Sequence, residues 1–416
     1  MNIRWAIAGV LALACAGAAM AAVQVYAPAR SHHAWTSIET GRYLARAGDC
    51  ESCHTAPGGK PYAGGRPVPT PFGIVYSTNI TSDPDTGIGA WSADDFYRAM
   101  HEGIDKQGER LYPAFPYPWF THMTRGDVDA IKDYLDTVKP VRQVNRAPEL
   151  GWPFSMRSML AVWDKLYLDA KQFQPDPERS AAWNRGKYLV DGAGHCGACH
   201  SAKNMLGHAD TSHPMQGGMA EHVFAPNLGA GERDGLSGWT KDDIVEYLAT
   251  GSNRYATAAG PMAEVVQAST QYLKQRDLEA MAIYLKSLEG PKAEAPNAPD
   301  KGAMRAGAAL YVDDCAGCHM NDGAGLPNAF PPLRASSAVQ AAKPDLLIAL
   351  ILEGARSPAT SAKPTGLMMP AFDGKLDDAE VAALTTYIRN AWSNRGGRVS
   401  KGDVAKLRRT LASASR

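Results

Sequence analysis

The sequence lacks an excess of charge of either sign. Among its 416 residues, 43 lysines and arginines balance 43 aspartates and glutamates, so the formal net charge is zero. Proteins that bind nucleic acid usually gather basic charge to meet the phosphates, and we therefore expect no nucleic acid partner. The chain also lacks a series of long apolar segments, which excludes a domain that crosses the membrane several times.

A long run without charge occurs at the N-terminus. No charged residue is found from Trp5 to Val25, and Arg4 precedes the run. Residues 1–22 are therefore predicted to be a secretory signal peptide, with Ala19-Met20-Ala21 as its small-residue cleavage site, or an uncleaved membrane anchor. In either case Arg4 would stay on the cytoplasmic side. This places the body of the protein at the periplasmic face of a bacterial cytoplasmic membrane.

Cysteine is scarce, with seven in the chain, and its placement excludes two common uses. Cys15 lies in the N-terminal apolar run, whereas the other six form three pairs, each with two intervening residues and a histidine directly after the second cysteine. A disulfide framework gives those histidines no role. A zinc site would need two pairs to converge on one ion. The three segments are Cys50-Glu51-Ser52-Cys53-His54, Cys196-Gly197-Ala198-Cys199-His200 and Cys315-Ala316-Gly317-Cys318-His319.

One unit is repeated around these segments. Each unit opens with a helix-like segment that contains a glycine, and each closes with an amphipathic helix that carries an apolar stripe and a tyrosine. The glycine would let an aromatic of the closing helix approach the backbone closely. The glycines are Gly41, Gly186 and Gly307, the stripes are Val128, Ile131 and Leu135, then Leu278, Met281 and Leu285, then Val381, Leu384 and Ile388, and the tyrosines are Tyr134, Tyr284 and Tyr387.

The first two units share features that the third lacks. Asn79-Ile80 is echoed by Asn227-Leu228, and Trp91 by Trp239. The third unit has no such tryptophan and is shorter. We therefore expect that the third unit either diverged further or faces a different partner.

Three units and their connections divide the chain. The predicted units are residues 36–139, 181–290 and 301–394. Residues 140–180 form a linker with a helical stretch, which either docks on its own neighbouring units or offers a contact face to a partner. Residues 291–300 are predicted to be a solvated spacer. Residues 395–416 form a basic tail, expected to be mobile and solvated or to lie against an anionic membrane surface.

Two thiols separated by two residues and followed by histidine are the attachment signature of c-type haem. The cysteines Cys50, Cys53, Cys196, Cys199, Cys315 and Cys318 are predicted to form thioethers, and His54, His200 and His319 to be the proximal iron ligands. The predicted fold is all-α, with three tandem class I cytochrome c domains, each wrapped round a covalent haem c. The predicted cofactor is therefore three haem c groups.

A methionine stands before each closing helix and is the predicted sixth ligand. Met123, Met262 and Met369 occupy these positions, the last two beside Pro261 and Pro370. Methionine on the distal side closes the iron site and suits electron transfer. Methionine is also a common core residue, so rivals remain. Met100 looks like core, Met215 and Met219 are weaker candidates in the second unit, and Met368 competes directly with Met369.

These residues resemble the triple-haem cytochrome c subunits of membrane-bound bacterial dehydrogenases that act on alcohols, aldehydes, gluconate and similar sugar acids. The resemblance spans about 36–392 and includes the attachment segments. It also includes Val75-Tyr76-Ser77-Thr78-Asn79-Ile80-Thr81, Tyr112-Pro113-Ala114-Phe115-Pro116-Tyr117, Trp183-Asn184-Arg185-Gly186 and Gly260-Pro261-Met262-Ala263-Glu264-Val265-Val266. It implies axial roles for Met123, Met262 and Met369.

The resemblance also implies a partner. A quinoprotein, flavoprotein or molybdenum subunit would oxidise a CH–OH or aldehyde donor. This chain would not oxidise that donor itself, but would relay the electrons to ubiquinone or a terminal oxidase. Two alternatives remain: a peroxidase-like haem enzyme with one open iron site, and the electron-donating cytochrome of an oxidase.

Overall fold

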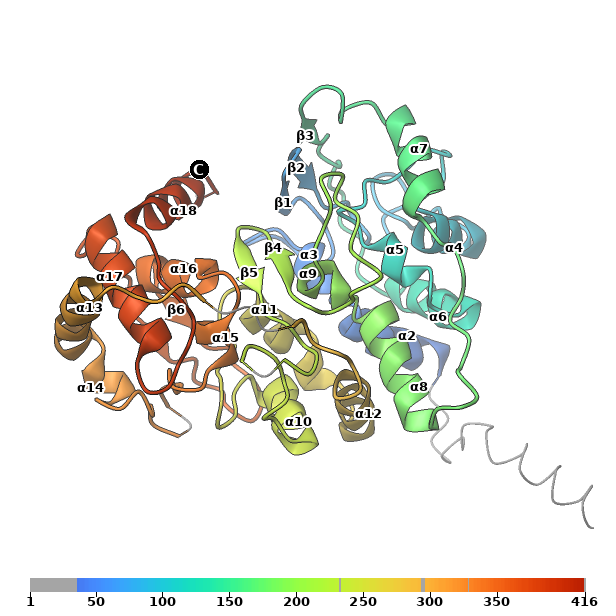
Figure 1. Ribbon diagram of the computed structural model, residues 1–416. Helices are drawn as coiled ribbons and strands as arrows, with labels where there is room; N and C mark the ends of the chain where they lie inside the picture. The colour runs from blue at the N-terminus through green and yellow to red at the C-terminus, as the bar shows by residue number, and fades with distance from the viewer. Residues whose placement is uncertain (1–35, 232, 293–295, 328, 415–416) are drawn as a thin grey trace, which may run out of the picture.

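The computed structural model describes residues 36–231, 233–292, 296–327 and 329–414. The predicted signal peptide or anchor lies outside these residues. The described chain is mostly helical, and the first unit lies beside the second, which in turn lies beside the third (Figure 1). No helix within the described ranges has the length and apolar character needed to cross a bilayer.

The first unit is built around a pair of helices that pack together, α2 and α6. Thr36 caps α2 through a reciprocal bond with Glu39, an arrangement that satisfies two free backbone donors at the helix start. The elements in order are α2 (Ser37–Ala47), α3 (Cys50–Cys53), β1 (Pro67–Thr70), β2 (Gly73–Tyr76), α4 (Ala93–Glu102), α5 (Tyr117–Phe120) and α6 (Arg125–Leu135).

The segment predicted as the first linker packs on the first unit. Its strand β3 (Glu149–Leu150) pairs with β2 to complete a small antiparallel sheet, and its helix is α7 (Ser158–Tyr167). Buried Asp164 of α7 accepts a hydrogen bond from the Tyr117 hydroxyl at 2.5 Å. The opposite side of α7 leaves Met159, Val162 and Leu166 exposed.

The second unit repeats the helix pair with α8 and α12. A π-helix follows α8 directly and leads into Cys196. The elements are α8 (Ala181–Tyr188), the π-helix η1 (Leu189–Ala193), α9 (Gly197–His200), β4 (Gly218–Ala220), β5 (Val223–Ala225), α10 (Lys241–Thr250), α11 (Pro261–Ala268), the 3₁₀-helix η2 (Thr270–Tyr272) and α12 (Gln275–Leu285).

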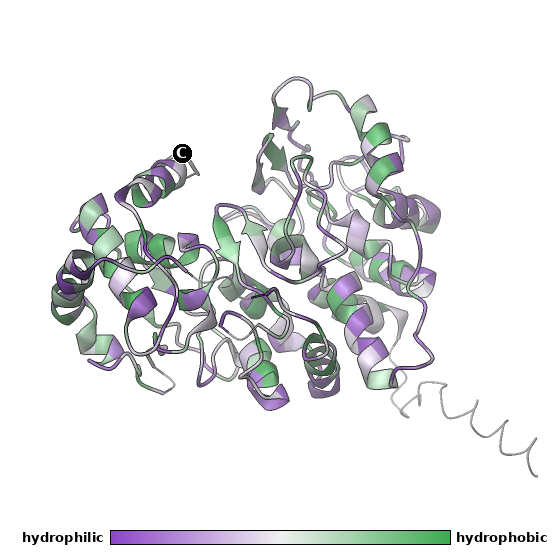
Figure 2. Cartoon of the chain, in the orientation of Figure 1, coloured by the Kyte–Doolittle hydropathy of each residue, from purple (hydrophilic) through white to green (hydrophobic). Residues whose placement is uncertain are grey.

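The third unit repeats the pair with α13 and α17. Its elements are α13 (Lys301–Asp314), α14 (Ala316–His319), α15 (Ser337–Gln340), α16 (Asp345–Glu353), β6 (Ala355–Arg356), β7 (Met368–Met369), α17 (Asp378–Asn390) and α18 (Lys401–Ala414). The small antiparallel sheets of the three units are an addition to the predicted all-α fold. Helix α16 and strand β5, both apolar over most of their length, lie side by side where the second and third units meet (Figure 2).

The predicted close contact between opening and closing helices is confirmed in all three units. A Cβ atom placed on Gly41 would lie 1.7 Å from the Ala130 carbonyl oxygen and 2.9 Å from Tyr134 Cβ. Gly186 and Gly307 meet Tyr284 and Tyr387 in the same way. Only glycine allows the backbones to approach this closely. The predicted apolar stripes of the closing helices are also confirmed, since every member is buried.

The expectation of a mobile, solvated C-terminal tail is wrong for most of its length. Helix α18 packs against α16 and α17, and its Val404, Leu407 and Leu411 are buried. These residues share one face of the helix, while the basic residues take the others. Arg408 on α18 pairs with Asp378 of α17 at 2.8 Å. The prediction rested on the basic residues of the tail and overlooked its apolar residues, which have ordinary helical spacing.

Candidate functional site

The three cysteine pairs occupy equivalent places in the structure. Each lies in one short helical turn directly after the opening helix, at α3, α9 and α14. In every pair the first cysteine is the less exposed and the second is exposed, and all six are free thiols. Two free thiols on one turn, one facing inward and one near the surface, can both react with the edge of a single planar group.

Each of the three histidines makes the same kind of hydrogen bond, and that bond fixes which ring nitrogen carries the proton. In each, Nδ1 lies within bonding distance of a backbone carbonyl oxygen, which can only accept, so Nδ1 carries the proton and Nε2 keeps its lone pair. Burial lowers the pKa of all three, which favours this neutral form. The bonds are His54 to Thr78 at 2.6 Å, His200 to Pro226 at 2.7 Å and His319 to Pro331 at 2.9 Å.

A pair of asparagines helps to position two of those carbonyls, a role that their repetition in the sequence did not reveal. Buried Asn79 follows Thr78, donates to the Val141 carbonyl at 2.7 Å and accepts from the Thr81 amide at 3.0 Å. Buried Asn227 follows Pro226 in the same position, and its side chain accepts from the Gly229 amide at 2.7 Å. The repeated asparagine was therefore a usable signal for the turn that holds each histidine.

Met123 is held rigidly in the first unit. Its side chain is 1% exposed and belongs to the main hydrophobic core. It stands in the tight turn between α5 and α6, where its amide donates to the Phe120 carbonyl at 2.9 Å. Thr124, the next residue, caps α6. Met100, expected to be core, is indeed buried on α4 among apolar side chains.

Two methionines compete in the second unit, and they occupy different surroundings. Met262 is half-buried on the first turn of α11, where Gly260 and Pro261 begin the helix. Met215 is 2% exposed, its amide donates to the Ser201 hydroxyl at 3.0 Å, and its Cε would lie 3.4 Å from a Cβ on Gly197. Met215 therefore packs against the turn that carries His200 itself, whereas Met262 comes from a separate helix.

Met368 and Met369 lie on opposite sides of one strand. Met369 pairs with Ala355 across the small sheet of β6 and β7 and packs against the core of the third unit. Met368 pairs with Arg356 and is 69% exposed. Successive side chains on a strand point to opposite faces, so only Met369 of the two is turned toward the interior.

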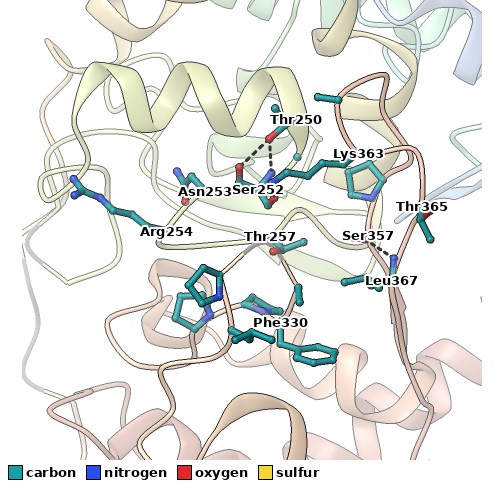
Figure 3. Close-up of a pocket in the computed structure, with 18 of the residues that line it drawn as sticks. Thr250, Ser252, Asn253, Arg254, Thr257, Phe330, Ser357, Lys363, Thr365 and Leu367 are labelled. Carbon is teal, nitrogen blue, oxygen red and sulfur yellow. Dashed lines mark hydrogen bonds between the residues drawn. The ribbon is translucent and has the colours of Figure 1, made fainter.

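A cavity of about 440 Å³ lies between the second and third units. Its lining includes Pro331, whose carbonyl binds His319, and Leu367, which stands two residues before Met369. Figure 3 shows Thr250, Ser252 and Lys363 on one side of this cavity and Phe330 on the other. The cavity thus reaches both the histidine loop and the methionine loop of the third unit, with polar groups from the second unit facing it.

These features define a c-type cytochrome. Free cysteine pairs on a helical turn and a neighbouring neutral histidine with Nε2 available are the groups that haem c attachment requires, and an inward methionine can supply the sixth ligand. A family model for cytochrome c matches residues 38–139 and 304–392.

Curated relatives extend the match over most of the chain. The cytochrome c subunit of gluconate 2-dehydrogenase from Pantoea cypripedii is 40% identical, covering 89% of this chain and 89% of its own. The cytochrome c subunit of the quinone-type alcohol dehydrogenase from Gluconobacter oxydans is 39% identical over 91% and 83%. The fructose dehydrogenase cytochrome subunit from Gluconobacter japonicus is 34% identical over 92% of this chain and 84% of its own. The chain belongs to the family of electron-transferring cytochrome c subunits of bacterial dehydrogenases.

Proposed function

We propose that this chain holds three haem c groups, one in each of the units 36–139, 181–290 and 301–394, and relays electrons singly between a dehydrogenase subunit and an acceptor. The observation that carries the proposal is the threefold recurrence of one arrangement: a histidine whose Nδ1 is bound by a carbonyl, and an inward methionine in the same unit. A single site with these donors suits one-electron transfer, and three in series suit a relay.

The proposed ligands are those that the sequence pattern and the family resemblance imply. The cysteine pairs Cys50 and Cys53, Cys196 and Cys199, and Cys315 and Cys318 would hold the haems. The iron ligands would be His54 and Met123, His200 and Met262, and His319 and Met369. Bound haem would supply an iron that alternates between Fe(II) and Fe(III). The surrounding residues would exclude water and tune each potential through burial and through the hydrogen bonds of the histidines.

The cavity between the second and third units is proposed to be the mouth of the third haem crevice. Pro331 and Leu367 line it, and each belongs to a loop that bears a proposed ligand. The second unit faces this mouth with Thr250, Ser252 and Asn253. Residues of the second unit would therefore border the exposed edge of a haem held in the third unit.

The partner is proposed to be a dehydrogenase catalytic subunit of the quinoprotein, flavoprotein or molybdenum type that acts on CH–OH or aldehyde donors. Support comes from the names of the relatives, which include gluconate and alcohol dehydrogenases. The acceptor would be ubiquinone or a terminal oxidase, at the periplasmic face of the cytoplasmic membrane. Mild detergent extraction, capture of this chain and mass spectrometry test the proposal. A stoichiometric dehydrogenase supports it, and a cytochrome found alone after cross-linking contradicts it.

Paired methionine variants test the ligands. Met369→Ala should open the third haem and admit carbon monoxide to one haem, whereas Met368→Ala, one residue away, should leave all three closed. Met262→Ala and Met215→Ala form the matching pair in the second unit. Visible spectra with and without carbon monoxide give the readout. Carbon monoxide binding to the reduced wild-type protein would instead favour the haem enzyme with an open site.

A further inference from the structure

Arg66 joins the first attachment segment to the second unit. Its Nη1 donates to the backbone carbonyl of Ser52, which lies between Cys50 and Cys53, at 3.0 Å. The same guanidinium forms a two-point ion pair with Glu264, in which Nη2 lies 2.8 Å from Oε2 and Nη1 bonds Oε1. A planar guanidinium bound at two points fixes orientation as well as distance.

Glu264 lies on the helix that carries the proposed ligand of the second haem. It follows Met262 by two residues on α11, and α11 packs directly against α3. Arg66 and Glu264 stand 198 residues apart in the chain. Both side chains are partly buried, with exposed fractions of 26% and 42%.

Arg66 thus ties the turn of the first attachment segment to the helix that bears Met262. The direct packing of α11 against α3 brings these two segments together.

We propose that the Arg66–Glu264 pair is a positioning element that sets the spacing between the first and second haems, and thereby the rate at which they exchange electrons. The inference rests on the proposed three-haem relay. Arg66 holds the turn between the first two attachment cysteines, and Glu264 holds the helix of Met262, so neither segment can shift without breaking the pair.

The test uses the full-length protein with its haems and measures electron redistribution between haems after flash photoreduction. Arg66→Lys keeps the charge but cannot bind both Glu264 oxygens and the Ser52 carbonyl together. We expect this variant to exchange electrons more slowly between the first two haems while their midpoint potentials stay near those of the wild type. Glu264→Gln should also slow the exchange. Wild-type rates in both variants would overturn the proposal.

Midpoint potentials give a second readout, because a substitution that only lowers the stability of the protein would not shift them. Glu264→Gln removes a negative charge that favours Fe(III), so the potentials of the flanking haems should rise, whereas Arg66→Gln should lower them. Asp85→Asn is the matched control, because its pair with Arg142 lies on the exposed surface of the first unit, and it should move neither rate nor potential. Unshifted potentials together with wild-type exchange rates in both pair variants, with lower stability alone, would contradict the inference.

The haem count of the unmodified protein separates the positioning role from the relay on which it rests. A haemochromogen assay that finds fewer than three haems would contradict the proposed function. Three closed haems together with wild-type exchange in the pair variants would contradict only the positioning role.

Discussion

The two junctions between the units are built differently. At the first junction, one continuous hydrophobic core includes Leu44 and Ile131 of the first unit and Leu189 and Leu285 of the second. Charged groups reinforce it. Asp277 of the second unit accepts from the Tyr43 hydroxyl of the first at 2.6 Å and pairs with Arg185 at 2.8 Å.

Hydrogen bonds cross the second junction, and Lys363 and Arg233 donate two of them, to the Ser252 hydroxyl and the Arg395 carbonyl. The third unit has its own hydrophobic cluster, which takes in Val223 from the second unit. Backbone amides of the loop between β6 and β7 bind side-chain amides of the second unit, Ala359 to Gln267 at 3.2 Å and Ser361 to Gln271 at 3.0 Å. The cavity of about 440 Å³ lies at this junction.

The difference indicates two cooperative bodies rather than three. Burial of apolar surface is the dominant favourable term in folding, so a shared core makes the first two units depend on each other. Neutral hydrogen bonds contribute only about 0.5–1.5 kcal/mol each, so we expect the third unit to unfold separately from its neighbour. The first two units are thus joined by a shared core, and the third has a core of its own.

Truncation of a core side chain should lower the free energy of unfolding more than any other change, and it tests directly whether the chain has two cooperative bodies. Leu44→Ala removes a side chain that is 2% exposed in the shared core, and Leu384→Ala removes one at 1% in the third unit. Each should cost about 2–5 kcal/mol. Calorimetry should show Leu44→Ala lowering the combined transition of units one and two, and Leu384→Ala lowering that of unit three. A single shared transition that moves in both variants would contradict the division of the chain into two cooperative bodies.

Asp277→Asn should cause the next largest loss of stability, and this loss should be confined to the first junction. The substitution removes charge-assisted hydrogen bonds to Arg185 and Tyr43, a loss of about 1.5–3 kcal/mol. Chemical denaturation of the haem-loaded protein measures it. An equal destabilisation of the third unit would show that the junctions are coupled.

Acid should weaken the first junction. Burial acts to raise the pKa of Asp277, but the bonds and charge of Arg185 outweigh it, so the pKa lies below the ordinary value. A depressed carboxyl pKa contributes stability above the unfolded value of about 3.9, and that stability is lost as pH falls through the folded value. Thermal melts from pH 6 down to acid should lose this contribution below about pH 4, and Asp277→Asn should show a smaller loss.

Gln267→Ala should produce the smallest effect. It removes one neutral hydrogen bond at the second junction, worth about 0.5–1.5 kcal/mol. Limited proteolysis between the second and third units should become faster, while the combined transition of units one and two stays in place. Ser287→Ala, away from this junction and bound to Trp183, is the control. Faster cleavage in both variants would point to general loosening.

Particular residues show what could be predicted. The glycine and tyrosine of each helix pair, the apolar stripes and the helical character of the chain followed from periodicity, and the structure confirms them. The C-terminal helix was missed because its charged residues outnumber Val404, Leu407 and Leu411. The Arg66–Glu264 pair had no sequence signal, since its members are 198 residues apart and each alone is an ordinary charged residue.

The sequence by itself determined the class of protein. Covalent attachment of haem c needs particular residues at a particular local spacing, and this spacing can be seen in the sequence without the fold. It also determined the threefold repeat. Only the tertiary structure decided which of Met368 and Met369 faces inward, which carbonyl binds each histidine and how the units join. These features depend on contacts between distant segments, whose free energies arise only when the whole chain has folded.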